Sequence, residues 1–273
     1  MCPVLRVSRS GFFAWLKKPP SKRDQETARL KPIIQKIQKV HRSSCGSRRM
    51  SSKLTEAGFP TGRFKAARLM TEASAPFVPT RKFRVTTDSK HNFEVSPNLL
   101  DRNFKTEAPN QAWVSDITYL WSKEGWSYLA VIIDLFNREI VGAAIKTQMD
   151  RSLVIDALKM AVWKKRPGTG LVFHSDRGSQ YCSKDFRSLL KFYGMKSSMS
   201  RKGNCWDNAV AESFFASLKK ERTMRTIYHD RRELTTDVGN YINMFYNCYR
   251  GHSYLGNKTP MEFASDGNLK MAA

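Results

Sequence analysis

The amino-acid sequence predicts a mixed α/β domain that follows a smaller helical region. Three strand-like segments, "WVSDITYL", "WSYLAVIIDLF" and "REIVGAAIK", are separated only by the turn-prone residues "SKEG" and "FN", which is typical of an antiparallel meander. A long helical pattern and a fourth apolar run, "LVFHSD", come next. A meander followed by strands that alternate with helices indicates a mixed sheet with helices on its faces.

Residues 1–75 are predicted to be helical and to bind DNA. Between residues 22 and 40 the apolar side chains recur at helical spacing; these are Leu30, Ile33, Ile34, Ile37 and Val40. A helix with Met50 and Leu54 then ends at the turn "GFPTG", and a second helix begins "TGRFKAARLM". Two short helices around a glycine-containing turn resemble a helix-turn-helix, although any small helical hairpin has the same pattern.

The segment 76–110 is predicted to be a basic linker, because it holds four prolines and no sustained periodicity. We assign 111–225 to a catalytic core and 226–273 to a C-terminal helical extension.

Within the core, the strands and helices are predicted to follow the order β-β-β-α-β-α-β-α. The segment "DRSLVIDALKMAVWKKRPG" has a helix start signal at Asp150, an apolar stripe and a stop at Pro167 and Gly168. After the fourth strand, "SKDFRSLLKFYG" predicts a helix closed by Gly194, and "MKSSMS" predicts a short fifth strand. Further helices are expected over 205–221 and 230–249.

The charge of the chain indicates a polyanionic partner. The formal net charge is +23 over 273 residues, with Lys and Arg outnumbering Asp and Glu by 23 to 8 in residues 1–110 and by 24 to 16 afterwards. Such a charge favours nucleic acid over its rivals, an anionic membrane surface or a ribosomal setting. No apolar run approaches the roughly 18 residues of a membrane span, so we expect no membrane association and a cytoplasmic location. Five widely spaced cysteines support neither a disulfide framework nor a zinc finger.

Three acidic residues are predicted to form the catalytic site. Asp116 lies inside the first strand, and Asp176 stands where the fourth strand ends, so the two approach each other if these strands are neighbours. Glu212 follows on a helix whose apolar residues face inward. Three clustered carboxylates repel one another, and oxygen ligands favour Mg²⁺ or Mn²⁺. Two such ions can activate a hydroxyl and stabilise the leaving oxygen of a phosphoryl displacement.

Several ordered motifs resemble one family. The segments "WVSDITYL", "VIIDLFNREIVG", "HSDRGSQYCS", "GNCWDNAVAESFFASLKKE" and "YINMFYNCYRGHSYLGNKTPMEF" are similar to the integrase-type core of bacterial insertion-sequence transposases of the IS3 family, specifically the product of the second reading frame. Asp176 and Glu212 have 35 residues between them, the DD(35)E spacing of that superfamily and of retroviral integrases. The resemblance extends to "VSRSGFFAWLKKPPS" and "CGSRRMSSKLTEAGF" near the N-terminus.

This resemblance implies an RNase H-like fold, a two-metal site, cleavage at the ends of a mobile element and joining of the freed 3′-hydroxyl to another strand. The implied partners are the terminal inverted repeats, the target DNA, further copies of the chain on DNA, and the product of an upstream reading frame or its fusion. The implied setting is a bacterial, nucleoid-associated protein. Two alternatives stay open: an inactive remnant that only binds element ends, and an RNase H-like nuclease that cuts without joining.

Five further residues are predicted to contact DNA. Lys219 lies seven residues after Glu212, about 20° away around a helix axis, where it can reach a phosphate. Arg177 and Gln180 follow Asp176 and are expected near the metals. Trp206 and Asn208 precede the catalytic helix, where a substrate-loop role and a helix-start role fit equally well.

Each catalytic assignment has an ordinary alternative. Asp116 could belong to a surface ion pair, Asp176 could cap a helix, and Glu212 could be a solvated helix residue. Other acids near the first strands, which are Asp134, Glu124 and Glu139, are assigned to turns or salt bridges, and His174 is assigned to a structural hydrogen bond.

Overall fold

The computed structural model describes residue 4 and the ranges 7–75, 77, 95–101, 103–201 and 205–272, with the side chains of 205, 206 and 267–272 excepted. The chain divides into two compact units, Met1–Val78 and Pro79–Ala273. Within these ranges no helix combines the length and apolar character that crossing a membrane requires.

The N-terminal unit is helical, as predicted. It contains α1 (Arg9–Lys17), α2 (Lys22–Val40), α3 (Ser47–Glu56) and α4 (Arg63–Glu72). A capping box between Ser21 and Asp24 starts α2. Leu30 and Ile34 of the predicted stripe are fully buried against α3 and α4, whereas α1 buries no residue. The hydrophobic core of this unit is therefore built by α2, α3 and α4.

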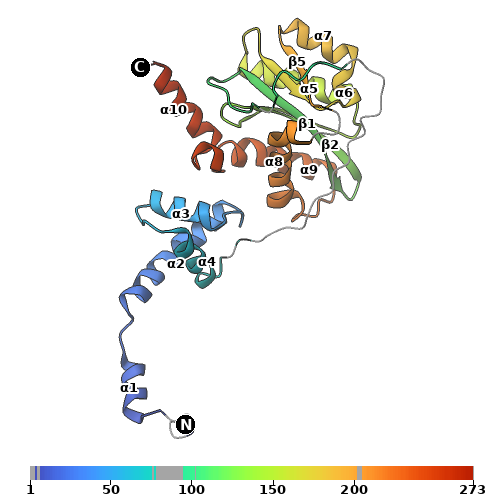
Figure 1. Cartoon of the computed structure of the whole chain (residues 1–273). Helices are drawn as coiled ribbons and strands as arrows, with labels where there is room; N and C mark the ends of the chain where they lie inside the picture. The colour runs from blue at the N-terminus through green and yellow to red at the C-terminus, as the bar shows by residue number, and fades with distance from the viewer. Residues whose placement is uncertain are drawn as a thin grey trace. The chain divides into compact units, whose positions relative to one another are not determined.

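The second unit is built on a five-stranded mixed sheet (Figure 1), which confirms the predicted fold class. Its strands are β1 (Ala112–Ser122), β2 (Gly125–Asp134), β3 (Ile140–Lys146), β4 (Val172–Ser175) and β5 (Lys196–Met199), in the order β3-β2-β1-β4-β5. The pairs β1–β2 and β2–β3 are antiparallel, and the pairs β1–β4 and β4–β5 are parallel. The meander thus forms one half of the sheet, and β1 joins it to the parallel half.

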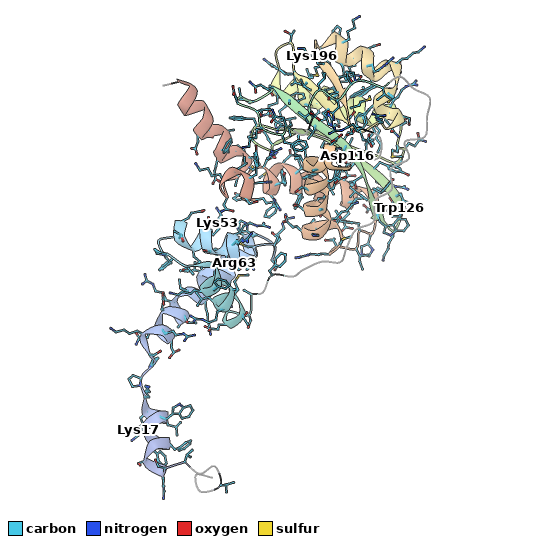
Figure 2. The ribbon with its side chains drawn as sticks, in the orientation of Figure 1. Lys17, Lys53, Arg63, Asp116, Trp126 and Lys196 are labelled. Carbon is cyan, nitrogen blue, oxygen red and sulfur yellow. The ribbon has the colours of Figure 1, made fainter. Side chains whose placement is uncertain are left out.

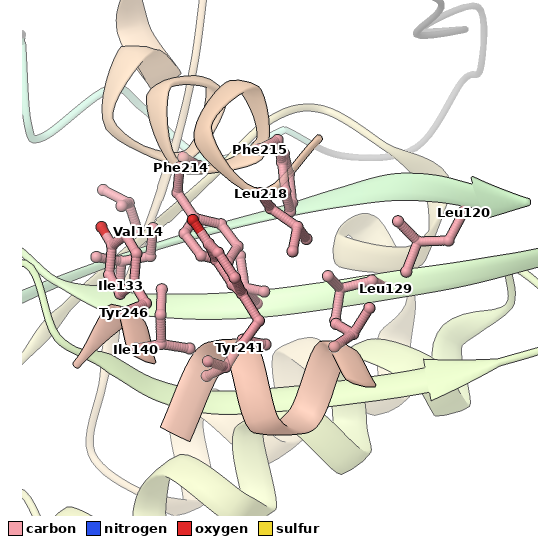
Figure 3. Close-up of a cluster of buried hydrophobic side chains, with 14 of the residues drawn as sticks. Val114, Leu120, Leu129, Ile133, Ile140, Phe214, Phe215, Leu218, Tyr241 and Tyr246 are labelled. Carbon is pink, nitrogen blue, oxygen red and sulfur yellow. The ribbon is translucent and has the colours of Figure 1, made fainter. Parts of the chain in front are cut away.

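Helices cover both faces of this sheet (Figure 1). One face packs on α5 (Arg151–Lys165), α6 (Ser179–Cys182) and α7 (Lys184–Phe192). The other packs on α8 (Ala209–Leu218), α9 (Arg231–Asn240) and the π-helical turn η3 (Tyr241–Tyr246), whose side chains converge on strand residues such as Leu129 and Ile133 (Figure 3). Successive strand residues therefore alternate between two separate apolar cores.

The predicted boundaries of α5 agree with the structure, whereas the helices predicted later in the chain are interrupted by 3₁₀ and π-helical turns. Asp150 caps α5 through its side chain, which accepts a hydrogen bond from the amide of Ser152. The helix predicted over 205–221 is a 3₁₀ turn, η1 (Cys205–Asn208), followed by α8 and a π-helical turn, η2 (Lys219–Thr223). The helix predicted over 230–249 is α9 followed by η3, and η4 (Ser253–Leu255) and α10 (Pro260–Ala272) complete the unit. Helical periodicity in the sequence does not distinguish these tighter and wider turns from an α-helix.

One glycine allows β3 and α5 to approach closely. A Cβ atom added at Gly142 would lie 2.3 Å from the carbonyl oxygen of Ala157 in α5. No side chain fits at this distance.

Part of the segment predicted as a linker lies against β5. The amide of Leu99 donates a hydrogen bond to Ser198 Oγ (2.9 Å), and the carbonyl oxygen of Pro97 accepts one from the amide of Met199 (3.3 Å). These bonds cover the outer edge of the sheet beside β5.

Candidate active site

The pairing of β1 with β4 brings Asp116 and Asp176 to the same level of the sheet. Ala112 and Val114 pair with Val172 and His174, and the same offset two residues further along matches Asp116 with Asp176. Neighbouring strands lie about 4.8 Å apart. Two carboxylates therefore stand side by side where β4 ends and β1 continues.

Backbone amides hold both carboxylates. Asp116 Oδ1 accepts a hydrogen bond from the amide of Ile117 at 2.8 Å, and Asp176 Oδ1 accepts one from the amide of Gly178 at 2.9 Å. A Cβ atom at Gly178 would lie 3.0 Å from Asp176 Oδ1. A side chain at position 178 would thus crowd the Asp176 carboxylate.

The two carboxylates act strongly on each other. Burial raises the pKa of Asp116 well above its ordinary value, the negative charge of Asp176 raises it further, and Glu212 contributes in the same direction. Lys219 partly opposes this rise in the pKa of Asp116. The protein therefore places excess negative charge in a largely desolvated site.

Glu212 lies in the first turn of α8, with an exposed side chain. Partial burial raises its pKa above the ordinary value. The neighbouring Phe214, Phe215 and Leu218 are buried against the sheet (Figure 3) and fix the helix there. Glu212 thus adds its negative charge to that of the carboxylate pair.

The carboxylate pair has the character of a divalent-cation site. Its oxygens are hard ligands, and a cation between them would relieve the repulsion that raises the pKa of Asp116. Among the residues described, no group of three His, Cys, Asp or Glu side chains is arranged to hold a metal ion. The pair by itself fits such an ion, and Glu212 is near enough to act on the pKa of Asp116.

A buried aspartate that the sequence did not single out anchors the segment that leads into α8. Asp207 is 1 % exposed, and its carboxylate accepts hydrogen bonds from Asn98 Nδ2 (3.1 Å) and from the amide (2.9 Å), Nε (3.2 Å) and Nη2 (3.1 Å) of Arg201. The next residue, Asn208, donates from Nδ2 to the carbonyl oxygen of Ser115 at 3.3 Å. Asn208 thus attaches the start of α8 to β1 beside Asp116, and Asp207 attaches it to Asn98 and Arg201.

Tyr181 lies behind the carboxylates and was also not foreseen. Its hydroxyl is 2.8 Å from Ser115 Oγ in a fully buried contact. Burial raises the pKa of Tyr181 well above its ordinary value, and Asp116 and Asp176 add to that effect. Tyr181 therefore stays neutral and packs as a buried side chain next to the two carboxylates.

The residues predicted to contact DNA lie in different environments. Lys219 is 8 % exposed, and burial lowers its pKa to about 8 although Asp116 raises it. Arg177 donates from Nε to the carbonyl oxygen of Ser200 (2.7 Å), and Gln180 donates to that of Met149 (3.0 Å). Lys219 and Glu212 do not share an exposed edge, because Lys219 is buried whereas Glu212 is exposed. The side chain of Trp206 lies outside the described residues.

The acids assigned to structural roles have such partners. Glu139 bonds Lys164 and Lys165, at 2.9 and 2.6 Å, and Glu124 accepts from the amide of Arg231 at 2.9 Å. Asp134 accepts from the amides of Asn110 (2.8 Å) and Phe136 (2.9 Å).

His174 is buried with both ring nitrogens close to serine hydroxyls. Nδ1 lies 2.9 Å from Ser198 Oγ, and Nε2 lies 3.3 Å from Ser200 Oγ. Burial lowers the pKa of His174 to about 4. These contacts agree with the predicted structural hydrogen bond.

Comparisons with known proteins agree with this geometry. One family described as "Integrase core domain" matches residues 106–205, and a second of the same description matches 212–266. The "Insertion element IS600 uncharacterized 31 kDa protein" of Shigella sonnei is 46 % identical over 96 % of this chain and 97 % of its own length. "Transposase InsF for insertion sequence IS3A" of Escherichia coli (strain K12) is 37 % identical over 96 % and 92 %. These matches confirm the expected integrase core, and the strand order confirms the expected mixed five-stranded sheet.

Solved structures give weaker likenesses. A simian T-cell lymphotropic virus intasome in complex with PP2A regulatory subunit B56 gamma has a TM-score of 0.49 at 17 % identity, covering 81 % of this chain and 70 % of that one. The HTLV-2 integrase catalytic core domain in complex with magnesium has a TM-score of 0.43 at 20 % identity, covering 57 % and 97 %.

Proposed function

This chain belongs to the IS3 family of insertion-sequence transposases, and from that premise we propose that it cleaves the ends of its element and joins them to target DNA through Asp116, Asp176 and Glu212. The polynucleotidyl transfer class follows from the integrase core. The residue assignment depends mainly on the placement of Asp116 beside Asp176. In this placement the negative charge of Asp176 raises the pKa of Asp116.

The carboxylates are proposed to hold Mg²⁺ or Mn²⁺, with Asp116 and Asp176 as the main ligands and Glu212 completing the set. When bound, such ions supply Lewis-acid stabilisation of the phosphodiester oxygens and ease deprotonation of the attacking hydroxyl. The amides of Ile117 and Gly178 orient the two aspartates before substrate arrives. Pre-oriented ligands lower the reorganisation needed at the reacting phosphate.

Five side chains are proposed to contact DNA near the carboxylates, and two of them, Lys219 and Arg177, are cations. Lys219 is close enough to Asp116 to oppose the rise in its pKa, so its ammonium can meet a phosphate at the site. Arg177 and Gln180 border the loop after β4, and Asn208 and Trp206 belong to the segment that leads into α8. We also propose that several copies of the chain assemble on the terminal repeats.

The N-terminal unit is proposed to recognise the element ends through α4. This helix buries Ala66, Leu69 and Met70, and it leaves Arg63 exposed and Phe64 85 % exposed at its N-terminal end. Recognition helices contact base edges with their N-terminal residues. Arginine pairs with guanine, and an apolar side chain contacts the methyl group of thymine.

Incubation of the purified protein with a labelled duplex of the element end, in Mg²⁺ or EDTA, tests the catalytic proposal. Asp176→Asn should abolish nicking and leave DNA binding in a gel-shift assay unchanged, because it removes ligand charge without altering the basic surface. Asp185→Asn is the matched control, since Asp185 forms an exposed ion pair with Arg151. Nicking by Asp176→Asn would show that the site is misassigned.

Two other outcomes identify the alternatives. Binding without a metal-dependent nick in the wild-type protein would favour the inactive remnant. Nicking without any joined product would favour an RNase H-like nuclease.

Phe64→Ala tests the recognition helix. We expect a loss of about tenfold in affinity for the element end and little change for unrelated DNA, as about 1–3 kcal/mol is lost with a base contact. Phe192→Ala on α7 is the control, because Phe192 is 80 % exposed and belongs to the other unit. Equal losses on both DNAs would argue against base recognition by α4.

A further inference from the structure

Four aromatic side chains form an exposed cluster on the β1–β2 hairpin, which we call the aromatic ladder. Tyr119 pairs with Tyr128 across the strands, and Trp121 pairs with Trp126. The ring centroids are 5.7 Å apart in the first pair and 4.8 Å in the second, and Tyr119 also meets Trp126 at 6.3 Å. The rings support one another as a continuous surface.

The ladder is exposed at its two tryptophans, whereas Tyr119 and Tyr128 are half-buried and Tyr128 packs against the core beneath. Trp121 is 54 % exposed and Trp126 is 55 % exposed. On the opposite face, Leu120 and Ser122 are buried, and the amide of Lys123 donates to the carbonyl oxygen of Tyr228. One face of the hairpin thus belongs to the core, and the other leaves two indole rings in solvent.

The hairpin extends beyond the catalytic carboxylates. β1 pairs with β4 only up to Val114 and with β2 as far as Ser122, so Trp126 lies toward the far end of the hairpin from Asp116 (Figure 2). Trp121 follows Asp116 by five residues, about 17 Å along the strand. Because side chains alternate between the two faces of a strand, the ladder lies on the face of the sheet opposite to the Asp116 carboxylate and is a separate surface.

The size of the ladder argues against a second protein copy as its ligand. An aromatic side chain buries about 150–250 Å² when fully covered, and the exposed parts of these four amount to roughly 200–400 Å² by that measure. A stable protein interface needs about 800 Å² on each partner. The exposed surface suits one or two nucleotide bases instead.

The charges at the rim favour a polyanion. Lys123 is exposed at the turn of the hairpin, whereas Lys146, which pairs with Tyr128 across β2 and β3, forms an ion pair with Asp156 at 2.6 Å. The acid of the turn, Glu124, accepts a hydrogen bond from the amide of Arg231. Aromatic faces bordered by cations are the usual construction of surfaces that bind single-stranded nucleic acid.

We propose that the aromatic ladder stacks on DNA bases that are unpaired or tilted out of the helix, at a surface separate from the catalytic carboxylates. The proposal rests on the transposase function above and adds a second contact to the same DNA. It assigns to Trp121 and Trp126 the capture of locally opened DNA.

The test compares two labelled duplexes of one sequence by fluorescence anisotropy in EDTA, one fully paired and one with about five unpaired nucleotides. The wild-type protein should bind the unpaired form more tightly. The double variant Trp121→Leu, Trp126→Leu should lose about 10- to 100-fold in affinity for it, in line with stacking energies. Trp163→Leu is the matched control, because Trp163 is 78 % exposed on α5, and it should keep the wild-type preference.

A conservative double variant, Trp121→Phe with Trp126→Phe, should retain most of the preference, which separates stacking from a folding defect. Absence of a wild-type preference, or equal losses on both duplexes in the leucine variant, would overturn the proposal. It would also be overturned if the leucine variant dissociated an oligomer and kept the preference. Asp176→Asn should keep the preference, so a wrong catalytic assignment would leave this measurement unaffected.

Discussion

Removal of one negative charge from the carboxylate pair should stabilise the metal-free protein. Asp176→Asn keeps the side-chain oxygen that accepts from the amide of Gly178 and removes the charge that raises the pKa of Asp116. A substitution expected to abolish catalysis is therefore expected to increase the free energy of unfolding in a chelator.

The register of β1 and β4 sets the size of the effect. Two unit charges about 5 Å apart repel by about 3 kcal/mol at an effective dielectric constant of about 20. Lys219 offsets part of this repulsion at Asp116, so we expect a gain of about 1–3 kcal/mol. At about 2–4 °C per kcal/mol for a unit of this size, the melting temperature should rise by roughly 2–12 °C.

The gain should depend on pH with a definite sign. Because the folded state raises the pKa of Asp116 above its ordinary value of 3.8, ionisation of Asp116 destabilises the fold only as the pH rises above that value. The difference between Asp176→Asn and the wild type should therefore be larger at pH 8 than at pH 5. Differential scanning fluorimetry in EDTA measures it at both values.

Two controls complete this experiment. Asp185→Asn removes an exposed charge of an ion pair with Arg151, so its melting temperature should change little. Added Mg²⁺ should stabilise the wild type more than Asp176→Asn. A melting temperature of Asp176→Asn that equals or falls below the wild type in EDTA would refute the reasoning, because it would mean that the two carboxylates do not repel each other.

Three further predictions concern the framework of the site. Asp207→Ala should cost about 2–4 kcal/mol in urea unfolding, because it removes the acceptor of several charge-assisted bonds, and it should slow nicking; unchanged stability would contradict the anchoring role. Burial raises the pKa of Glu139, but Lys164 and Lys165 hold this pKa below the ordinary value of 4.5 in the folded state. The ion pairs of Glu139 therefore stabilise the fold fully above pH 4.5, and their contribution is lost as the pH falls through the lower pKa of the folded state. Between pH 7 and pH 3 the free energy of unfolding of the wild type should thus fall by about 1–3 kcal/mol more than that of Glu139→Gln. Equal decreases in the two proteins would contradict this prediction. Gly142→Ala should destabilise by about 1–3 kcal/mol, whereas Gly239→Ala, with open space around it, should be neutral or stabilising; similar effects of both would deny the close contact of β3 with α5.

Much of the fold was predictable because it depends on local periodicity. The alternation of side chains in 112–134 and the stripe of α5 encode a strand or a helix within a few residues. The start of α8 was not predictable, because the hydrogen bonds of Asp207 come from Asn98 and Arg201. These partners are distant or lie across a loop, and no periodic pattern records them.

The sequence by itself determined the class of the fold, the basic character and the family, since composition, periodicity and ordered motifs are properties of the chain. Only the tertiary structure decided that β4 lies parallel to β1 in a register that sets Asp116 beside Asp176, that Lys219 is buried and that two indole rings remain exposed. The physical reason is that desolvation and charge repulsion depend on distances through space. These distances are set when the strands pair and the helices cover them.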